Sequence, residues 1–155
     1  MKAKFILAGA AVCLAAAVVC FAADDPMIGT WKLNEAKSKI GAGSPKNTTV
    51  IYEAAGDSVK VTTDGTDGDG KPSHSEWTGK YDGKDYPVTG DPNTDTRSYK
   101  KVNDHTLAFT NKKGGKVTIS GQGVVSADGK SRTVTLSGTD SNGKKYTSTT
   151  VYDKQ

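Results

Sequence analysis

The sequence predicts an all-β fold, an antiparallel up-and-down β-barrel of about 8 to 10 strands. Short segments of alternating apolar and polar residues are separated by Asp, Asn and Gly turns at intervals of roughly 8 to 15 residues, which is typical of an antiparallel meander. No helical periodicity of useful length follows residue 40. So many strands in so short a chain favour closure into a barrel, or a tightly packed sandwich, because exposed strand edges promote aggregation.

The strands are expected where alternation is clear and turn residues flank it. In 58–63, for example, Val59 and Val61 face one side and polar residues the other. Asp82-Gly83 and Asn142-Gly143 accept the positive φ of a tight hairpin turn. The expected strands are 29–33, 48–54, 58–63, 73–81, 84–88, 97–102, 106–111, 116–125, 132–138 and 145–152.

Three segments are expected to lie outside the strands. Residues 34–39 suit one helical turn, which the Gly- and Pro-containing segment 41–45 then breaks. The stretch 64–72 is a loop rich in Gly and Asp, and 90–95 is a polar loop that contains Pro92.

Residues 1–22 are predicted to be a cleaved signal peptide. Lys2 and Lys4 give a basic start, 5–21 is an apolar run, and Cys20 and Ala22 are the small residues that precede a cleavage site. The protein is therefore expected in the periplasm or outside the cell, with no transmembrane segment after cleavage. Retention of the segment as an anchor, or a lipid anchor on Cys20, are the alternatives.

Residues 23–155 are expected to form a single domain, because about 133 residues can build one core. Cys13 and Cys20 both lie in the signal segment, so the mature chain has no disulfide and no Cys-based metal site. Its formal charge of about +2 is too small, and its lysines too scattered, for a nucleic-acid surface. We expect a monomer.

Gly29-Thr30-Trp31-Lys32-Leu33 resembles the opening strand of the lipocalin and fatty-acid-binding (calycin-type) barrels. The order that follows, an irregular segment and then a run of antiparallel strands, is similar as well. The resemblance implies a lipocalin-like barrel whose closed end is plugged by Trp31, with Arg132 on the penultimate strand packed across the indole. A guanidinium can lie flat over an aromatic ring, so this pairing is chemically reasonable.

A second stretch resembles a different group. Residues 81–92, continuing to 97–101, are similar to small exported bacterial proteins of unassigned activity. This likeness implies a compartment and no reaction.

No catalytic constellation stands out, and we expect no enzyme, metal or cofactor. His74 and Glu76 form a His-x-Glu pair, but the Cys-x-x-Cys partner of zinc deaminases is impossible here, so a surface pair on a strand is expected. The aspartates of 64–69, and Asp91 and Asp95, lack the spacing of a calcium loop and suit turns instead. A small hydrolase or isomerase that uses His74 or these aspartates is a weaker third possibility.

Several aromatic side chains lie on separate expected strands and could converge inside a barrel: Tyr52, Trp77, Tyr86, Tyr99, Phe109 and Tyr146. They could line a cavity for a small apolar or amphipathic molecule, or simply fill a core that has few Leu and Ile. The candidate ligand-binding residues are Trp77, Tyr86, Arg97 and Tyr99. The predicted function is non-covalent binding of such a molecule, and the alternative is an envelope structural or interaction domain with a filled core and no ligand. An internal cavity of a few hundred Å³ would favour the first.

Overall fold

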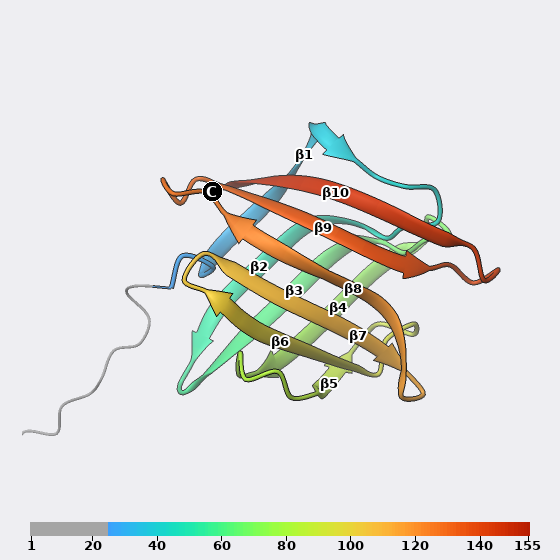
Figure 1. Ribbon diagram of the computed structural model, residues 1–155, viewed down its shortest axis with the longest axis horizontal. Helices are drawn as coiled ribbons and strands as arrows, with labels where there is room; N and C mark the ends of the chain where they lie inside the picture. Colours follow the sequence, from blue (N-terminus) through green and yellow to red (C-terminus); the bar gives the residue numbers. More distant parts are fainter. Residues whose placement is uncertain (1–24) are drawn as a thin grey trace, which may run out of the picture.

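The computed structural model describes residues 25–155, which form a closed antiparallel up-and-down β-barrel of ten strands, with no helix in this part of the chain (Figure 1). The predicted signal segment lies outside the described residues. Each strand pairs with its neighbours in sequence, and β1 closes the barrel against β10. The strands are β1 (Gly29–Lys39), β2 (Lys46–Ala55), β3 (Ser58–Thr66), β4 (Pro72–Gly79), β5 (Tyr86–Thr89), β6 (Thr96–Asn103), β7 (Thr106–Lys113), β8 (Lys116–Val125), β9 (Ser131–Thr139) and β10 (Lys145–Lys154).

The chain reverses between β9 and β10 at the Asp- and Gly-containing turn that the sequence predicts. Asp140 Oδ1 accepts hydrogen bonds from the backbone N–H groups of Asn142 (2.9 Å) and Lys144 (2.8 Å). Gly143 has φ of 79°, a conformation that costs glycine little because it has no Cβ. The Asp side chain and the glycine together reverse the chain, as expected for this kind of turn.

The helical turn expected at 34–39 is wrong, because this segment continues β1 as a large bulge. Asn34 pairs with Val151 and Lys39 with Thr149, so the residues between them have almost no counterpart on β10. Ser38 holds the bulge in place: its hydroxyl donates to the carbonyl of Asn34 (2.7 Å) and accepts from the N–H of Val151 (2.9 Å). The bond to Val151 and the pairing of this segment with β10 outweigh the local helix preference.

The tight hairpin expected at Asp82-Gly83 is also absent. β4 ends at Gly79, and residues 80–85 lie along β6: Gly83 N–H donates to the Tyr99 carbonyl (2.8 Å), and Lys101 N–H donates to the Tyr81 carbonyl (3.2 Å). The Tyr81 ring packs edge-on against that of Tyr99, with centroids 6.0 Å apart, which favours this position of the loop.

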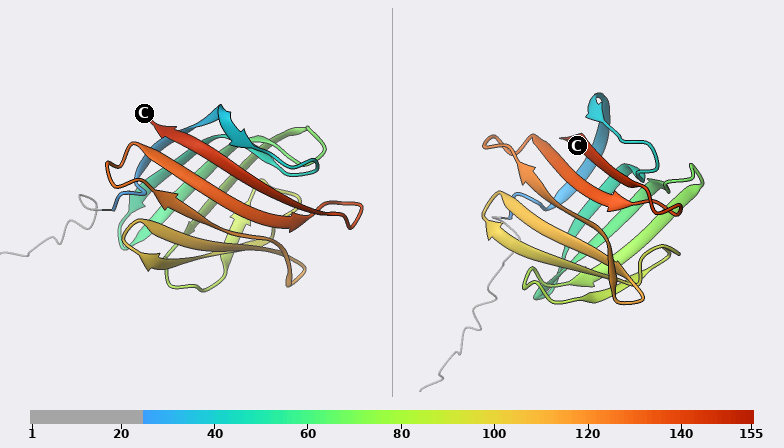
Figure 2. Two further views of the ribbon diagram at one scale, coloured as in Figure 1. Left: turned by 45° about the horizontal axis from the view of Figure 1, so that its top comes forward. Right: turned by 45° about the vertical axis from the view of Figure 1, so that its right-hand side comes forward.

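One end of the barrel is filled, and we call it the base. Trp31 is completely buried there and donates from its indole N–H to the carbonyl of Met27 (2.8 Å), whose side chain is 1% exposed. The C-terminal Gln155 donates its N–H to the carbonyl of Thr30 (3.0 Å), so both ends of the described chain lie at the base (Figures 1 and 2). Residues 25–155 contain no helix that is long and apolar enough to cross a membrane.

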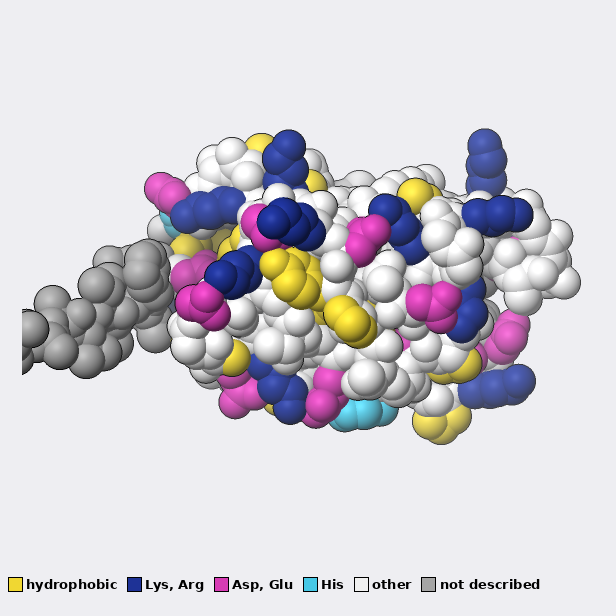
Figure 3. All heavy atoms as spheres, turned by 90° about the horizontal axis from the view of Figure 1, so that it is seen from below, with side chains coloured by type: hydrophobic (Ala, Val, Ile, Leu, Met, Phe, Trp, Pro, Cys, Tyr) yellow, Lys and Arg dark blue, Asp and Glu magenta, His cyan; other side chains and the backbone are white. Residues whose placement is uncertain are grey.

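The outer face of the barrel is polar. Lysine and acidic side chains are interleaved on the face shown in Figure 3. The large apolar side chains that stand out of the described surface are three valines on β6 and β8, Val102, Val117 and Val124. Alternation along the strands therefore divides a hydrated exterior from the interior, as the sequence predicts.

Candidate functional site

A cavity of about 310 Å³ occupies the barrel above the base. It reaches from Tyr52 and Arg132, deep in the barrel, to the loops 40–45, 67–71, 90–95 and 139–144 at the other end, which we call the mouth. At about 30 Å³ for a water molecule, the cavity holds the equivalent of about ten waters, and it lies at the lower end of the size range of ligand pockets.

Aromatic rings form much of the inner wall, and Tyr99 is central among them. Its ring packs against Trp77 (centroids 4.8 Å apart), Tyr52 (6.2 Å) and Phe109 (6.1 Å). Tyr52, Tyr99 and Phe109 face the cavity. A rigid aromatic wall of this kind can contact the apolar part of a ligand without losing much side-chain freedom.

Arg132, on β9, places a positive charge at the bottom of the cavity. Its guanidinium carbon lies 4.8 Å from the centre of the Tyr52 ring and 5.8 Å from that of Tyr152, and Nη2 donates to the Tyr52 hydroxyl (2.8 Å). The residue is only 5% exposed, yet its Nε and Nη1 are buried without a hydrogen-bond partner among the described residues. A buried donor without a partner is costly, so this guanidinium keeps unused hydrogen-bond donors.

Arg97, on β6, places a second guanidinium in the cavity wall. Its Nε donates to Asn111 Oδ1 on β7 (2.7 Å), and the residue is 8% exposed. Cross-strand pairing of Arg97 with Asn111 brings the two side chains together. Asn111 orients the guanidinium and leaves its positive charge in place.

Within residues 25–155, no buried carboxylate balances these charges. Arg97 and Arg132 are the only buried charged residues in the described part of the chain. Burial raises the pKa of the Tyr52 hydroxyl above its ordinary range, while the nearby Arg132 lowers it by a smaller amount. Tyr52 therefore stays neutral and hydrogen-bonds the guanidinium without neutralising it.

The candidate ligand-binding residues divide into two groups. Arg97 and Tyr99 line the cavity. Trp77 is 1% exposed, and its indole N–H donates to the carbonyl of Arg97 (2.8 Å), so it supports the wall from behind. Tyr86 packs edge-on against Trp77 and donates its hydroxyl to Asp82 Oδ2 (3.0 Å), away from the cavity lining. Contact of any of the four with a ligand stays a prediction.

The expected stacking of Arg132 on Trp31 takes a different form in the structure. The cation over the Trp31 ring is Lys154, with Nζ 5.1 Å from the centroid, whereas Arg132 lies over Tyr52 and Tyr152. The strand register explains why the cation over Trp31 is Lys154 and not Arg132. Trp31 on β1 pairs with Lys154 on β10, whereas Arg132 on β9 pairs with Tyr152, which lies farther from the base. Trp31 is a base residue, while Arg132 belongs to the cavity.

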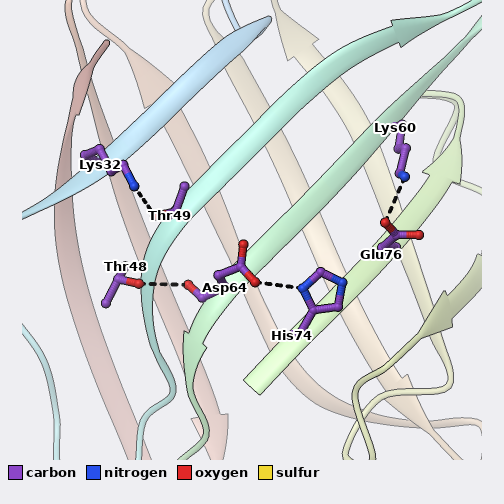
Figure 4. A network of polar contacts seen from close by, with 7 residues as sticks. All are labelled: Lys32, Thr48, Thr49, Lys60, Asp64, His74 and Glu76. Carbon is purple, nitrogen blue, oxygen red and sulfur yellow. Dashed lines mark hydrogen bonds and ion pairs between the residues drawn. The ribbon is translucent and has the colours of Figure 1, made fainter. Parts of the chain in front are cut away.

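His74 and Glu76 lie on the outer face of β4, as the surface-pair interpretation predicts (Figure 4). His74 Nδ1 lies 2.7 Å from Asp64 Oδ1 on β3, and Glu76 Oε1 forms an ion pair with Lys60 Nζ at 2.8 Å. No group of three or more potential metal ligands occurs within residues 25–155. This polar network is exposed and lies outside the cavity lining.

Sequence reasoning counted Tyr52 among the aromatic residues that could converge inside the barrel but did not select it as a ligand-binding candidate, and it missed Asn111 as a cavity residue. The alternation of 48–54 places Val50, Tyr52 and Ala54 on one face, and that signal identifies Tyr52 as inward. Asn111 had no such signal, because its role depends on being opposite Arg97 in the β6–β7 register.

No family model matches the sequence, and no curated protein matches it either. Among solved structures, the chain is similar to EF1p2_mFAP2b bound to DFHBI, with 12% identity, a TM-score of 0.49, and coverage of 84% of this chain and 94% of that one. It is also similar to a redesigned beta barrel, mFAP1, bound to DFHBI, with 18% identity, a TM-score of 0.44, and coverage of 85% and 98%. Neither likeness bears on what this chain binds.

Proposed function

We propose that this protein is an exported, monomeric, lipocalin-like barrel that binds a small amphipathic molecule non-covalently in its cavity. The apolar part of the ligand packs against the rings of Tyr52, Tyr99 and Phe109. An oxygen-rich or acidic group of the ligand accepts hydrogen bonds from Arg132 and Arg97. Export to the periplasm or the medium rests on the signal-like residues 1–22.

The observation that carries this proposal is the pair of uncompensated guanidinium groups in a cavity of about 310 Å³. Burial of a charge is unfavourable unless the charge is paired and hydrogen-bonded. Nε and Nη1 of Arg132 lack such partners within the described chain. A bound acceptor group would supply them, and its own desolvation would be offset by charge-assisted hydrogen bonds.

The same cavity disfavours the alternative of a structural envelope domain with a filled core. A barrel that serves only as a support gains stability from a fully packed interior, because each void loses contacts. Here the base is packed in that way around Trp31 and Met27, but a cavity of about 310 Å³ remains above it.

The direct test is native mass spectrometry of the mature protein purified from its own source, together with displacement of a bound anilinonaphthalene sulfonate dye. We expect a co-purifying small molecule, or dye fluorescence that small amphipathic anions reduce. Repeated absence of both an adduct and saturable dye binding would contradict the proposal. N-terminal sequencing of the exported protein tests cleavage at residue 22 separately.

Arg132→Met tests the carrying observation. The variant keeps an unbranched side chain of similar length but removes the charge and the donors. We expect dye affinity to fall by roughly 10- to 100-fold, since a hydrogen bond to a charged group contributes about 1.5–3 kcal/mol. Lys100→Met, which removes a positive charge from the exposed outer face of β6, should leave the affinity unchanged. Equal affinities for all three proteins would place the dye elsewhere.

A further inference from the structure

The mouth of the cavity has the opposite charge to its interior. Four aspartates line the cavity on the mouth loops: Asp67 and Asp69 between β3 and β4, Asp91 between β5 and β6, and Asp140 between β9 and β10. The positive charges of Arg97 and Arg132 lie deeper along the same cavity.

These four aspartates are not neutralised by neighbouring lysines. The eight ion pairs of the described residues involve other carboxylates, and none includes Asp67, Asp69, Asp91 or Asp140. Lys113 also lines the mouth, but its Nζ is paired with Asp95 Oδ1 at 2.6 Å. The lining of the mouth therefore carries a net negative charge.

Turn formation uses only part of the hydrogen-bonding capacity of these side chains. Oδ1 accepts from backbone N–H groups in Asp67 (from Asp69, 3.0 Å), Asp91 (from Asn93, 2.8 Å) and Asp140 (from Asn142, 2.9 Å). No hydrogen bond within residues 25–155 uses Oδ2 of these three. An asparagine could form the same turns, so the negative charges are additional to what the turns require.

The loops that carry three of these aspartates are packed together, so the mouth is preformed. A Cβ added at Gly43, in the β1–β2 loop, would lie 3.1 Å from Asp140 Oδ2, and one added at Gly68 would meet the backbone of Gly43. At physiological salt, these charges act on an incoming group over a Debye length of about 8 Å.

A purely anionic molecule must bring its charge past this mouth before it reaches the arginines. A molecule with a positive outer end is attracted at the mouth while its negative end is attracted inside. We propose that the ligand is a compact zwitterion, whose anionic group lies at Arg132 and Arg97 and whose cationic group lies at the aspartates of the mouth. This inference rests on the proposed function, because it assigns both ends of a ligand in the same cavity.

The test compares three probes with the same aromatic body: phenylpropanoate, its para-aminomethyl derivative, and para-propylbenzylamine. The first has only the anionic end, the second has both ends, and the third has only the cationic end. Isothermal titration calorimetry at low salt should show the zwitterion binding at least tenfold more tightly than either singly charged probe. Raising the salt concentration should reduce this preference, because the mouth is exposed to solvent.

Asparagine substitutions identify the source of the preference. The variant with D67N, D69N, D91N and D140N keeps oxygen acceptors for the turns, and we expect its preference for the zwitterion over phenylpropanoate to fall below about threefold. Asp128→Asn is the matched control: Asp128 Oδ1 accepts from Lys130 N–H in the β8–β9 turn, and it does not line the cavity. This control should keep the preference. If the fourfold variant fails to fold, Asp91→Asn alone should reduce the preference about twofold or more.

Three outcomes overturn the inference: phenylpropanoate binds as tightly as the zwitterion, the preference survives the asparagine substitutions, or no probe binds to a protein that binds the dye. In each of these the proposed ligand-binding function stands. If neither the dye nor any probe binds, and no adduct co-purifies, the proposed function itself fails.

Discussion

At the scale of single residues, the interior of this barrel is built around a buried cation. Arg132 has one hydrogen-bond partner among the described side chains, the Tyr52 hydroxyl, which in turn donates to the Tyr99 hydroxyl (3.3 Å). Sequence reasoning placed Arg132 late in the chain and facing inward, but assigned it to Trp31. The partner depends on the exact register of β9, β10 and β1, and alternation of residue types does not determine that register.

Tyr52→Phe tests how much Arg132 depends on its single partner. The substitution keeps the ring under the guanidinium but removes the acceptor, so we expect the free energy of unfolding to fall by about 1.5–3 kcal/mol. Tyr99→Phe breaks only the bond between two neutral hydroxyls and should cost about 0.5–1.5 kcal/mol. Urea denaturation followed by tryptophan fluorescence measures both. A larger loss for Tyr99→Phe than for Tyr52→Phe would contradict this description of the interior.

At the scale of elements, the strand order was predictable because short Asp, Asn and Gly turns mark it along the chain. The two departures, the bulge in β1 and the loop of residues 80–85, occur where contacts between distant segments outweigh local preference. Ser38 binds β10, and Tyr81 packs on β6. The same limit applies to the cavity: Trp77 and Tyr99 are both buried, but only Tyr99 lines the cavity, and alternation along the strands does not distinguish the two.

Ser38→Ala tests the role of the bulge in closing the barrel. It removes the acceptor of the Val151 N–H and the donor to the Asn34 carbonyl, on the seam between β1 and β10. We expect a loss of about 1–3 kcal/mol in the free energy of unfolding, because partly buried backbone groups lose their partners. Hydrogen exchange should show faster exchange of the Val151 amide. Lys37→Ala, at an exposed position of the same bulge, is the control and should change neither quantity measurably.

At the scale of the whole molecule, the fold combines a packed base with a cavity that opens toward the mouth. A polar exterior surrounds both, and many of its carboxylates form hydrogen bonds or ion pairs. In Asp95, a hydrogen bond from the Gly114 N–H, followed by one from Lys113, lowers the pKa of the carboxyl. Hydrogen bonds from Lys60 to Glu76 and from Lys101 to Asp104 have the same effect on those carboxyls.

These shifts predict the direction of the pH dependence of stability. A carboxyl whose pKa is lower in the folded state stabilises the fold above its unfolded pKa of about 4, and the contribution disappears as the pH falls through the lower value. We therefore expect the urea midpoint to decrease as the pH falls from 5 to 2. Asp95→Asn should show a smaller decrease, since it has no charge to lose. A midpoint that stays constant across this range would contradict the prediction.

The position of the two ends of the described chain has a practical consequence for measuring what the barrel binds. Met27, whose carbonyl accepts from the Trp31 indole, and Gln155, which is bonded to Thr30, both lie at the base. Figure 2 shows the C-terminal end of β10 at the opposite end of the barrel from the β9–β10 hairpin. A tag, a bead or a fusion partner attached at Gln155 would leave the entrance unobstructed. The protein can therefore be immobilised by its tail as a sensor, with every molecule presenting its opening to the solution.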